Sequence, residues 1–181
     1  MLERNLFAGF GGQGMLLMGE ILAMSGMLED KYVSWLPSYG PEMRGGTANC
    51  SVVISDKPIA SPVITQANCV VAMNRPSLDK FEKTVKPGGL LIVNSSLVDI
   101  QAQRNDIEVY YVPANELAEK LGSPQVANMV MLGAYLEKKP VVLLDSIVTA
   151  LLKKVGQKRA HLVDVNKAAL SAGAEIIKET Y

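Results

Sequence analysis

Residues 6–15 read Leu6-Phe7-Ala8-Gly9-Phe10-Gly11-Gly12-Gln13-Gly14-Met15, a short apolar run followed by closely spaced glycines. The apolar run is typical of a buried strand, and the glycines predict a tight turn directly after it. From residue 15 to residue 28 the chain carries a single charge, Glu20, which predicts an apolar helix that must be covered on nearly every side. We therefore expect a strand, a glycine loop and a helix, with the sheet on one side of the helix and a partner subunit on another.

The rest of the chain alternates between strand and helix candidates. Strands are expected at 32–36, 47–55, 69–73, 90–93 and 107–112, with a helix beginning at Pro76 and further helices at 115–121, 124–138, 143–154 and 164–180. In the last helix, Asp164 is the expected N-cap. Its buried face is expected to carry Val165, Ala169, Ala172 and Ile176.

This alternation predicts an α/β fold with a largely parallel sheet and helices on both faces, a Rossmann-like three-layer arrangement. No repeat, low-complexity tract or linker interrupts the sequence. A single domain over residues 1–181 is therefore expected.

Composition argues against several classes of function. The chain has 18 basic and 18 acidic residues and no formal net charge, so neither nucleic acid nor a membrane surface is expected as a partner. Hydrophobic residues make up 49% of the chain, which is explained equally well by a well-filled core or by surface that a partner covers. No signal peptide or membrane-spanning stretch is recognised, which predicts a cytoplasmic location.

Cys50 and Cys69 are the only cysteines, and His161 is the only histidine. An iron–sulfur cluster normally takes four thiolates, so the chain is not expected to hold one alone. One imidazole and two separated thiols also give little support for a zinc site or a Cys–His nucleophile. Both cysteines lie in apolar runs and are predicted to be buried, reduced and inert.

Glycine-rich and polar segments follow four of the predicted strands, at 11–14, 38–46, 74–75 and 94–96. Ligands bind beyond the carboxyl ends of parallel strands, so these segments are the candidate site. Within the first, Gly11, Gly12, Gln13 and Gly14 let the backbone approach a ligand, and the start of the following helix favours an anion such as phosphate. The alternative is that the glycines only let this helix pack closely on its strand.

The second segment adds Tyr39, Glu42, Arg44 and Gly45 to the candidate binding residues, and Asn74 comes from the third. Arg44 could make forked contacts to a phosphate or carboxylate of a ligand or another chain. An internal Glu42–Arg44 pair on a solvated turn is the alternative. No titratable pair suited to catalysis accompanies Glu42, so the site is predicted to bind and no catalytic residue is assigned.

Two further features leave alternatives open. Asn128 lies in an apolar helical segment and is either a contact to a ligand or subunit or a satisfied core amide. A dinucleotide site would require an acidic residue roughly 20 positions after the glycine loop, at the end of the second strand. Trp35, Leu36 and Pro37 stand there instead, whereas Glu29 and Asp30 precede the strand. NAD binding is therefore the weaker hypothesis.

Three motifs in order, GFGGQG at 9–14, YGPEMRGG at 39–46 and NMVMLGA at 128–134, resemble the gamma subunit of 2-oxoacid:ferredoxin oxidoreductases. The resemblance extends over essentially the whole chain. The continuation RGGTANC at 44–50 is more similar to the 2-oxoglutarate branch of the family than to the pyruvate branch.

The resemblance implies an assembly that oxidatively decarboxylates a 2-oxoacid, giving acyl-CoA, carbon dioxide and reduced ferredoxin. It implies alpha and beta subunits, with or without a delta subunit, that carry thiamine diphosphate, magnesium and iron–sulfur clusters. Coenzyme A is then a co-substrate, ferredoxin an indirect partner, and this chain a non-catalytic subunit without a cofactor of its own. Its strand-end loops would contact partner chains and coenzyme A phosphates.

Two alternatives come from other classes. One is a free-standing oxidoreductase that binds NAD or FAD, and the other is a homodimeric binding protein that needs no partner subunits. A homodimer of the isolated chain is also compatible with the subunit interpretation.

Overall fold

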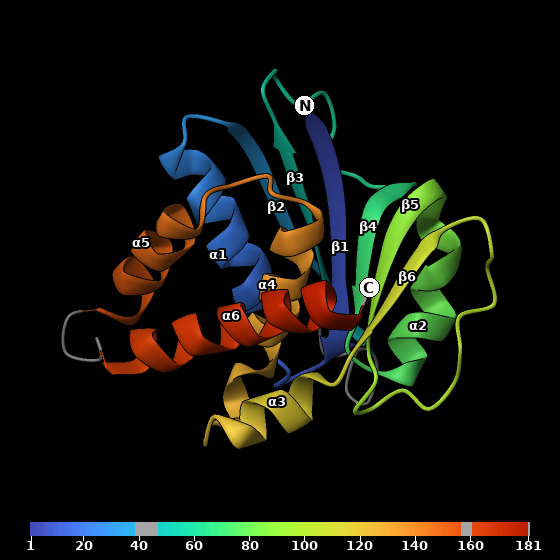
Figure 1. Cartoon of the computed structure of the whole chain (residues 1–181). Helices are drawn as coiled ribbons and strands as arrows, with labels where there is room; N and C mark the ends of the chain where they lie inside the picture. The colour runs from blue at the N-terminus through green and yellow to red at the C-terminus, as the bar shows by residue number, and fades with distance from the viewer. Residues whose placement is uncertain (39–46, 157–160, 181) are drawn as a thin grey trace.

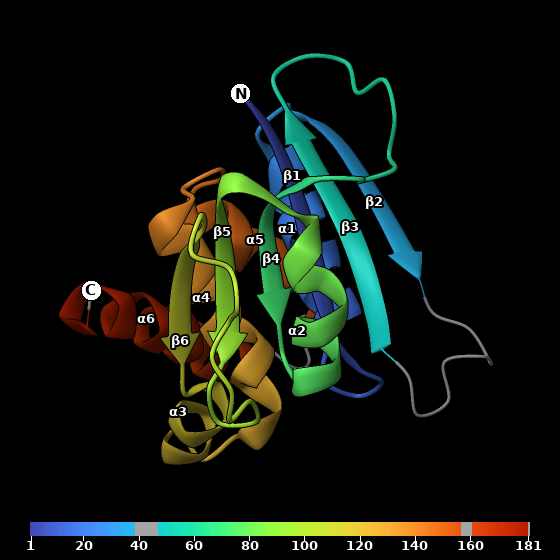
Figure 2. The ribbon, with the colours of Figure 1, turned by 90° about the vertical axis from the view of Figure 1, so that its right-hand side faces the viewer.

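The computed structural model describes residues 1–38, 47–156 and 161–180, and their strands form one sheet in the order β2-β3-β1-β4-β5-β6. The strands are β1 (Leu2–Phe10), β2 (Tyr32–Ser38), β3 (Thr47–Ser55), β4 (Ala67–Ala72), β5 (Val85–Asn94) and β6 (Glu108–Val112). β1, β4, β5 and β6 pair in parallel, whereas β3 is antiparallel to both β1 and β2 (Figure 2). The largely parallel sheet is confirmed, and β3 is its one reversed strand.

Helices cover both faces of this sheet (Figure 1). They are α1 (Met15–Leu28), α2 (Arg75–Phe81), α3 (Ala114–Lys120), α4 (Ala127–Lys138), α5 (Leu144–Val155) and α6 (His161–Thr180), with 3-10 turns η2 (Glu82–Thr84) and η3 (Pro124–Val126). The larger core lies between the sheet and α1, α4, α5 and α6, and a smaller core lies under α2. The expected α/β class with helices on both faces is therefore confirmed.

α1 packs directly on the antiparallel part of the sheet. A Cβ at Gly19 would overlap the sulfur of Cys50, and a Cβ at Gly26 would lie 2.8 Å from Val33. The other side of α1 meets α5, where Lys154 Nζ lies 2.5 Å from Glu20 Oε1. A helix of the same chain therefore supplies much of the expected cover on this side. Leu17 and Met27 of α1 stay exposed, and cover of these residues by a partner subunit stays a prediction.

α6 differs from the prediction in its start and in its buried face. The helix already includes His161, so Asp164 lies in its first turn and is not the N-cap. The fully buried positions are Val163, Ala169, Leu170, Gly173 and Ile177, whereas Val165 and Ile176 are only partly buried. The contact with α4 selects this face, because a Cβ at Gly173 would overlap the carbonyl oxygen of Val130.

No helix in the described ranges combines the length and apolar character that a membrane crossing requires.

Candidate functional site

The carboxyl ends of β1, β4, β5 and β6 lie along one edge of the sheet, where the loops before α1, α2 and α3 gather (Figure 1). The chain leaves β1 toward α1 on one face and leaves neighbouring β4 toward α2 on the opposite face. The crevice between the two strand ends is therefore a topological switch point, where open α/β sheets place their ligands. The sequence-predicted segments 11–14 and 74–75 border it.

A hydrogen bond joins the two sides of this crevice. Gln13 Oε1 accepts from the side-chain amide of Asn74 at 2.9 Å and from the backbone N–H of Phe10 at 2.6 Å. Asn74 in turn caps α2, because its Oδ1 accepts from the backbone N–H of Ser77 at 2.9 Å. The structure thus brings together Gln13 and Asn74, which the sequence analysis placed on separate loops of one edge.

The glycine loop combines two separate requirements. Gly14 has φ 76° and precedes α1 as an N-cap without a side-chain hydrogen bond; a Cβ there would overlap the amide of Asn128. Gly12 has φ 91°, and a Cβ there would meet nothing within 4 Å. Close packing therefore accounts for Gly14, whereas Gly12 has a left-handed backbone beside open space. Gly11 is also exposed.

Asn128 is a satisfied core amide. Its Nδ2 donates to the carbonyl oxygen of Gly14 at 3.1 Å, its Oδ1 accepts from Met129 N–H at 3.0 Å, and the residue is 3% exposed. Of the two interpretations left open by the sequence, the structure favours the core amide. Its effect is to fasten the start of α4 to the glycine loop.

A second amide ties the ends of three strands together. Asn94, at the end of β5, donates to Asn115 Oδ1 at 2.8 Å and to the carbonyl oxygen of Met73 at 3.3 Å. Its own Oδ1 accepts from the backbone N–H groups of Ser96 and Ala114. Asn94 is fully buried, so its role is to hold the ends of β4, β5 and β6 rather than to contact a ligand directly.

Two hollows lie on either side of the glycine loop. One, of about 210 Å³, has Gln13, Asn115 and Gln125 as its polar side chains. The other, of about 260 Å³, is mainly apolar and is bordered by Phe10, the glycines and the first turn of α1. Each is smaller than an ordinary small-molecule site of about 300–1,000 Å³. The described edge therefore suits part of an extended ligand, and its polar contacts are uncharged amides.

Sequence reasoning missed Asn115 and Gln125. Asn115 could have been found, because it follows the carboxyl end of a predicted strand after Pro113. Gln125 precedes α4 rather than following a strand, and only the folded arrangement brings it to this edge.

Four candidate residues, Tyr39, Glu42, Arg44 and Gly45, lie outside the described residues. Their segment leaves β2 after Ser38. Since β2 and β1 both run opposite to β3, the carboxyl end of β2 lies at the same edge as that of β1. Their membership of the binding site stays a prediction.

The sheet order also bears on dinucleotide binding. In a Rossmann site the second strand lies beside the first, so that its terminal carboxylate reaches the ribose of the nucleotide held by the glycine loop. Here β3 lies between β1 and β2. The end of β2 also carries no acid, and both features argue against NAD.

Both thiols of the chain lie in the core. Burial raises the pKa of the Cys50 thiol to about 12 and raises the pKa of Cys69 as well, so both are protonated at neutral pH and the prediction of buried, free cysteines is confirmed. Within the described ranges, His, Cys, Asp and Glu side chains form no group of three that could hold a metal.

Taken together, the fold and this edge define an α/β protein with a candidate binding site and no assigned catalytic residue. Residues 4–176 match the family described as pyruvate ferredoxin/flavodoxin oxidoreductase, and the chain belongs to this family.

Similar proteins agree with this assignment. 2-Oxoglutarate synthase subunit KorC of Methanocaldococcus jannaschii is 37% identical over 99% of this chain and 96% of its own length. Ketoisovalerate oxidoreductase subunit VorA of Methanothermobacter thermautotrophicus is 38% identical over 97% of this chain, which spans only 36% of that relative.

Solved structures give the same result. The gamma subunit of a keto/oxoacid ferredoxin oxidoreductase from Geobacter sulfurreducens has a TM-score of 0.84, 30% identity and coverage of 98% of this chain and 99% of its own. A 2-oxoglutarate:ferredoxin oxidoreductase chain from Magnetococcus marinus, solved with 2-oxoglutarate, coenzyme A and succinyl-CoA bound, shares the fold with a TM-score of 0.89 at 22% identity; this chain covers 31% of it. The resemblance to gamma subunits is confirmed.

Proposed function

We propose that this chain is the non-catalytic gamma subunit of a 2-oxoacid:ferredoxin oxidoreductase and that its glycine-loop edge helps to position coenzyme A. The observation that supports this most directly is the similarity to KorC, which extends over 96% of that subunit. The uncharged amides and glycines of the edge suit binding and orientation rather than proton transfer.

The chemistry of the assembly belongs, in this proposal, to its other subunits. Alpha and beta subunits, with or without a delta subunit, would hold thiamine diphosphate, magnesium and the iron–sulfur clusters, and would pass electrons to ferredoxin. The two cysteines of this chain are buried and far fewer than a cluster requires. The assembly is expected to work in the cytoplasm.

Coenzyme A fits the chemistry of the edge. Its pantetheine arm carries amide groups, which could exchange hydrogen bonds with Gln13, Asn115 and Gln125 in the 210 Å³ hollow. Its phosphates suit the N-terminus of α1, where backbone N–H groups and the helix dipole favour an anion. Arg44 and Tyr39 would extend this site.

For the substrate we propose 2-oxoglutarate. Three KorC relatives are 36–38% identical and matched over 93–98% of their lengths, whereas a fourth KorC is 29% and the pyruvate synthase subunit PorC 31% identical. Two VorA relatives reach 37–38%, but this chain spans only 36% of their length. An assay of the purified assembly with 2-oxoglutarate, 2-oxoisovalerate and pyruvate separates the three. A preference for either of the other two acids would correct the substrate but not the subunit assignment.

The site is tested by replacing Gln13 and Asn115 together with alanine in the complete assembly. We expect the KM for coenzyme A to rise about tenfold, the effect of losing about 1.4 kcal/mol of binding, while kcat changes little because the reacting groups lie elsewhere. Gln103→Ala, on the exposed loop before β6, is the matched control. An unchanged KM in the double variant would remove the edge from the coenzyme A site.

A further inference from the structure

One region of the sheet has a face that no helix covers. On the side that carries α2, the outer part formed by β2, β3 and the start of β1 is crossed only by residues 56–66 (Figure 2). Cross-strand rows on this side join Leu2 with Ser55 and Tyr32, and Arg4 with Val53. We call this surface, together with residues 56–66, the open face.

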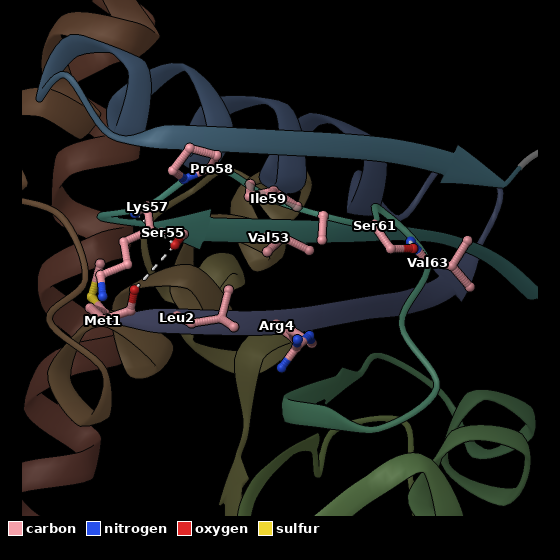
Figure 3. A pocket seen from close by; sticks show the side chains of 11 residues that line it. Met1, Leu2, Arg4, Val53, Ser55, Lys57, Pro58, Ile59, Ser61 and Val63 are labelled. Atoms are coloured by element: carbon pink, nitrogen blue, oxygen red, sulfur yellow. Dashed lines mark hydrogen bonds between the residues drawn. The ribbon is translucent and has the colours of Figure 1, made fainter.

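The open face holds two hollows that are larger than those beside the glycine loop and lie away from that edge. One of about 550 Å³ lies between β1, β3 and residues 57–63, with an apolar lining that includes Leu2, Val53, Ile59 and Val63 (Figure 3). A second, of about 390 Å³, lies on the β2 side of the same segment against Tyr32. Val63 is 61% exposed and Tyr32 50% exposed, so much apolar surface faces solvent.

Two cations border the larger hollow without a carboxylate partner in the described residues. Arg75 and Arg104 both contact aspartates, whereas Arg4 and Lys57 have no such contact although both line the hollow. The nearby carboxylate of Asp56 is already paired with the N-terminal ammonium group at 2.5 Å. A half-buried guanidinium beside apolar side chains is stabilised when an anion reaches it.

We infer that the open face is the docking surface for another subunit of the same oxidoreductase, which presents a carboxylate beside an apolar side chain. The carboxylate would form a forked pair with Arg4, and the apolar side chain would fill the hollow between Leu2, Ile59 and Val63. This inference rests on the proposed gamma-subunit function. It agrees with the VorA relative, in which the matching part is 36% of a longer chain and so has other protein attached to it.

A second copy of this chain is a poorer occupant. A two-fold interface places the same patch against itself. The patch of a second copy would offer Arg4 and Lys57 no unpaired carboxylate, because Asp56 is already paired with the N-terminal ammonium group, and bringing further cations to this surface opposes binding. The charges of the open face therefore favour a different, acidic partner.

The first test is Arg4→Glu in the full chain, with binding to the remaining subunits, purified from its own cells, measured at low and high salt. We expect the dissociation constant to rise at least about tenfold, with a weaker salt dependence, because an attractive charge pair becomes repulsive. Arg4→Lys keeps the charge but cannot form the forked pair, so its affinity should lie between those of the wild type and Arg4→Glu. Lys167→Glu is an equal charge reversal at an exposed position of α6, a helix on the other side of the sheet. This variant should bind like the wild type.

The second test is a photo-crosslinker placed at Val63 in the assembled complex. It should capture a peptide of another subunit that contains Asp or Glu next to an apolar residue. Capture of a second copy of this chain would overturn the docking inference but not the proposed function. Wild-type affinity of an Arg4→Glu protein with an unchanged melting temperature would do the same. A wild-type chain that binds no other subunit would instead overturn the proposed function.

Discussion

Buried asparagine side chains hold the loops at the strand ends in place by hydrogen bonds to the backbone. Asn74, Asn94 and Asn128 are each at most 3% exposed and each satisfies backbone groups of a neighbouring segment. The rule that ligands lie beyond parallel strand ends was enough to place Gln13 and Asn74 at one edge from sequence. Their hydrogen bond, and the choice of Asn128 as a structural amide, depended on side-chain positions that no sequence pattern contains.

Asn94→Ala tests the most heavily used of these amides. Its loss leaves the buried Ala114 N–H and Met73 carbonyl groups without their partner. Each unsatisfied group costs about 1–3 kcal/mol, so we expect the free energy of unfolding to fall by about 3 kcal/mol in urea titrations. Ser95→Ala, at an exposed neighbouring position, should change it by less than about 0.5 kcal/mol. A stable Asn94→Ala protein would show that the network is dispensable.

The buried thiol Cys50 predicts a fall in stability at alkaline pH. Its pKa is raised from the ordinary value of 9.0 to about 12 in the folded chain, so the unfolded chain loses this proton first as pH rises. The stabilisation is complete below pH 9 and is lost progressively toward pH 12, with a limiting slope of about 1.4 kcal/mol per pH unit. In denaturant titrations between pH 8 and 10.5, the free energy of unfolding should fall more steeply with pH for the wild type than for Cys50→Ala. Parallel curves would contradict the burial of the thiol.

Helices and strands were predicted well where a periodic pattern or a turn signal marked them. Strand direction and the buried face of a helix, which depend on tertiary packing, were predicted less well. The reversal of β3 could have been inferred, because the residues between Ser38 and Thr47 are too few for the crossover of a dozen or more that parallel neighbours require. The buried face of α6 could not. Its alanines suggested one buried face. Another face is buried instead, because Gly133 of α4 and Gly173 of α6 each lie close to the backbone of the other helix.

Gly173→Ala tests the α4–α6 contact. Alanine normally favours a helix over glycine by about 1 kcal/mol, but here its Cβ would overlap the Val130 carbonyl oxygen. Overpacking costs about 1–3 kcal/mol or more, so we expect the melting temperature measured by circular dichroism to fall. Ser171→Ala, on the exposed side of the same helix, should leave it nearly unchanged. A higher melting temperature of the Gly173→Ala protein would mean that α4 and α6 lie farther apart than in the structure.

At the scale of the whole molecule, strand and helix periodicity predicted the class of fold, and three ordered motifs predicted the family. Neither could identify the proposed docking surface, because Arg4, Val53 and Val63 come from separate segments and form a patch only in the folded chain. The missing acid at the end of β2 argued against NAD from sequence. The insertion of β3 beside β1 supplies a second, independent reason.

The most direct test of the central claim is to purify the tagged chain natively and without oxygen from its own cells and to assay the eluate for 2-oxoacid oxidation dependent on coenzyme A. We predict that subunits bearing thiamine diphosphate and iron–sulfur clusters elute with it, that the eluate reduces ferredoxin, and that the isolated chain does not. A chain that elutes alone, inactive or with bound NAD or FAD, would contradict the account.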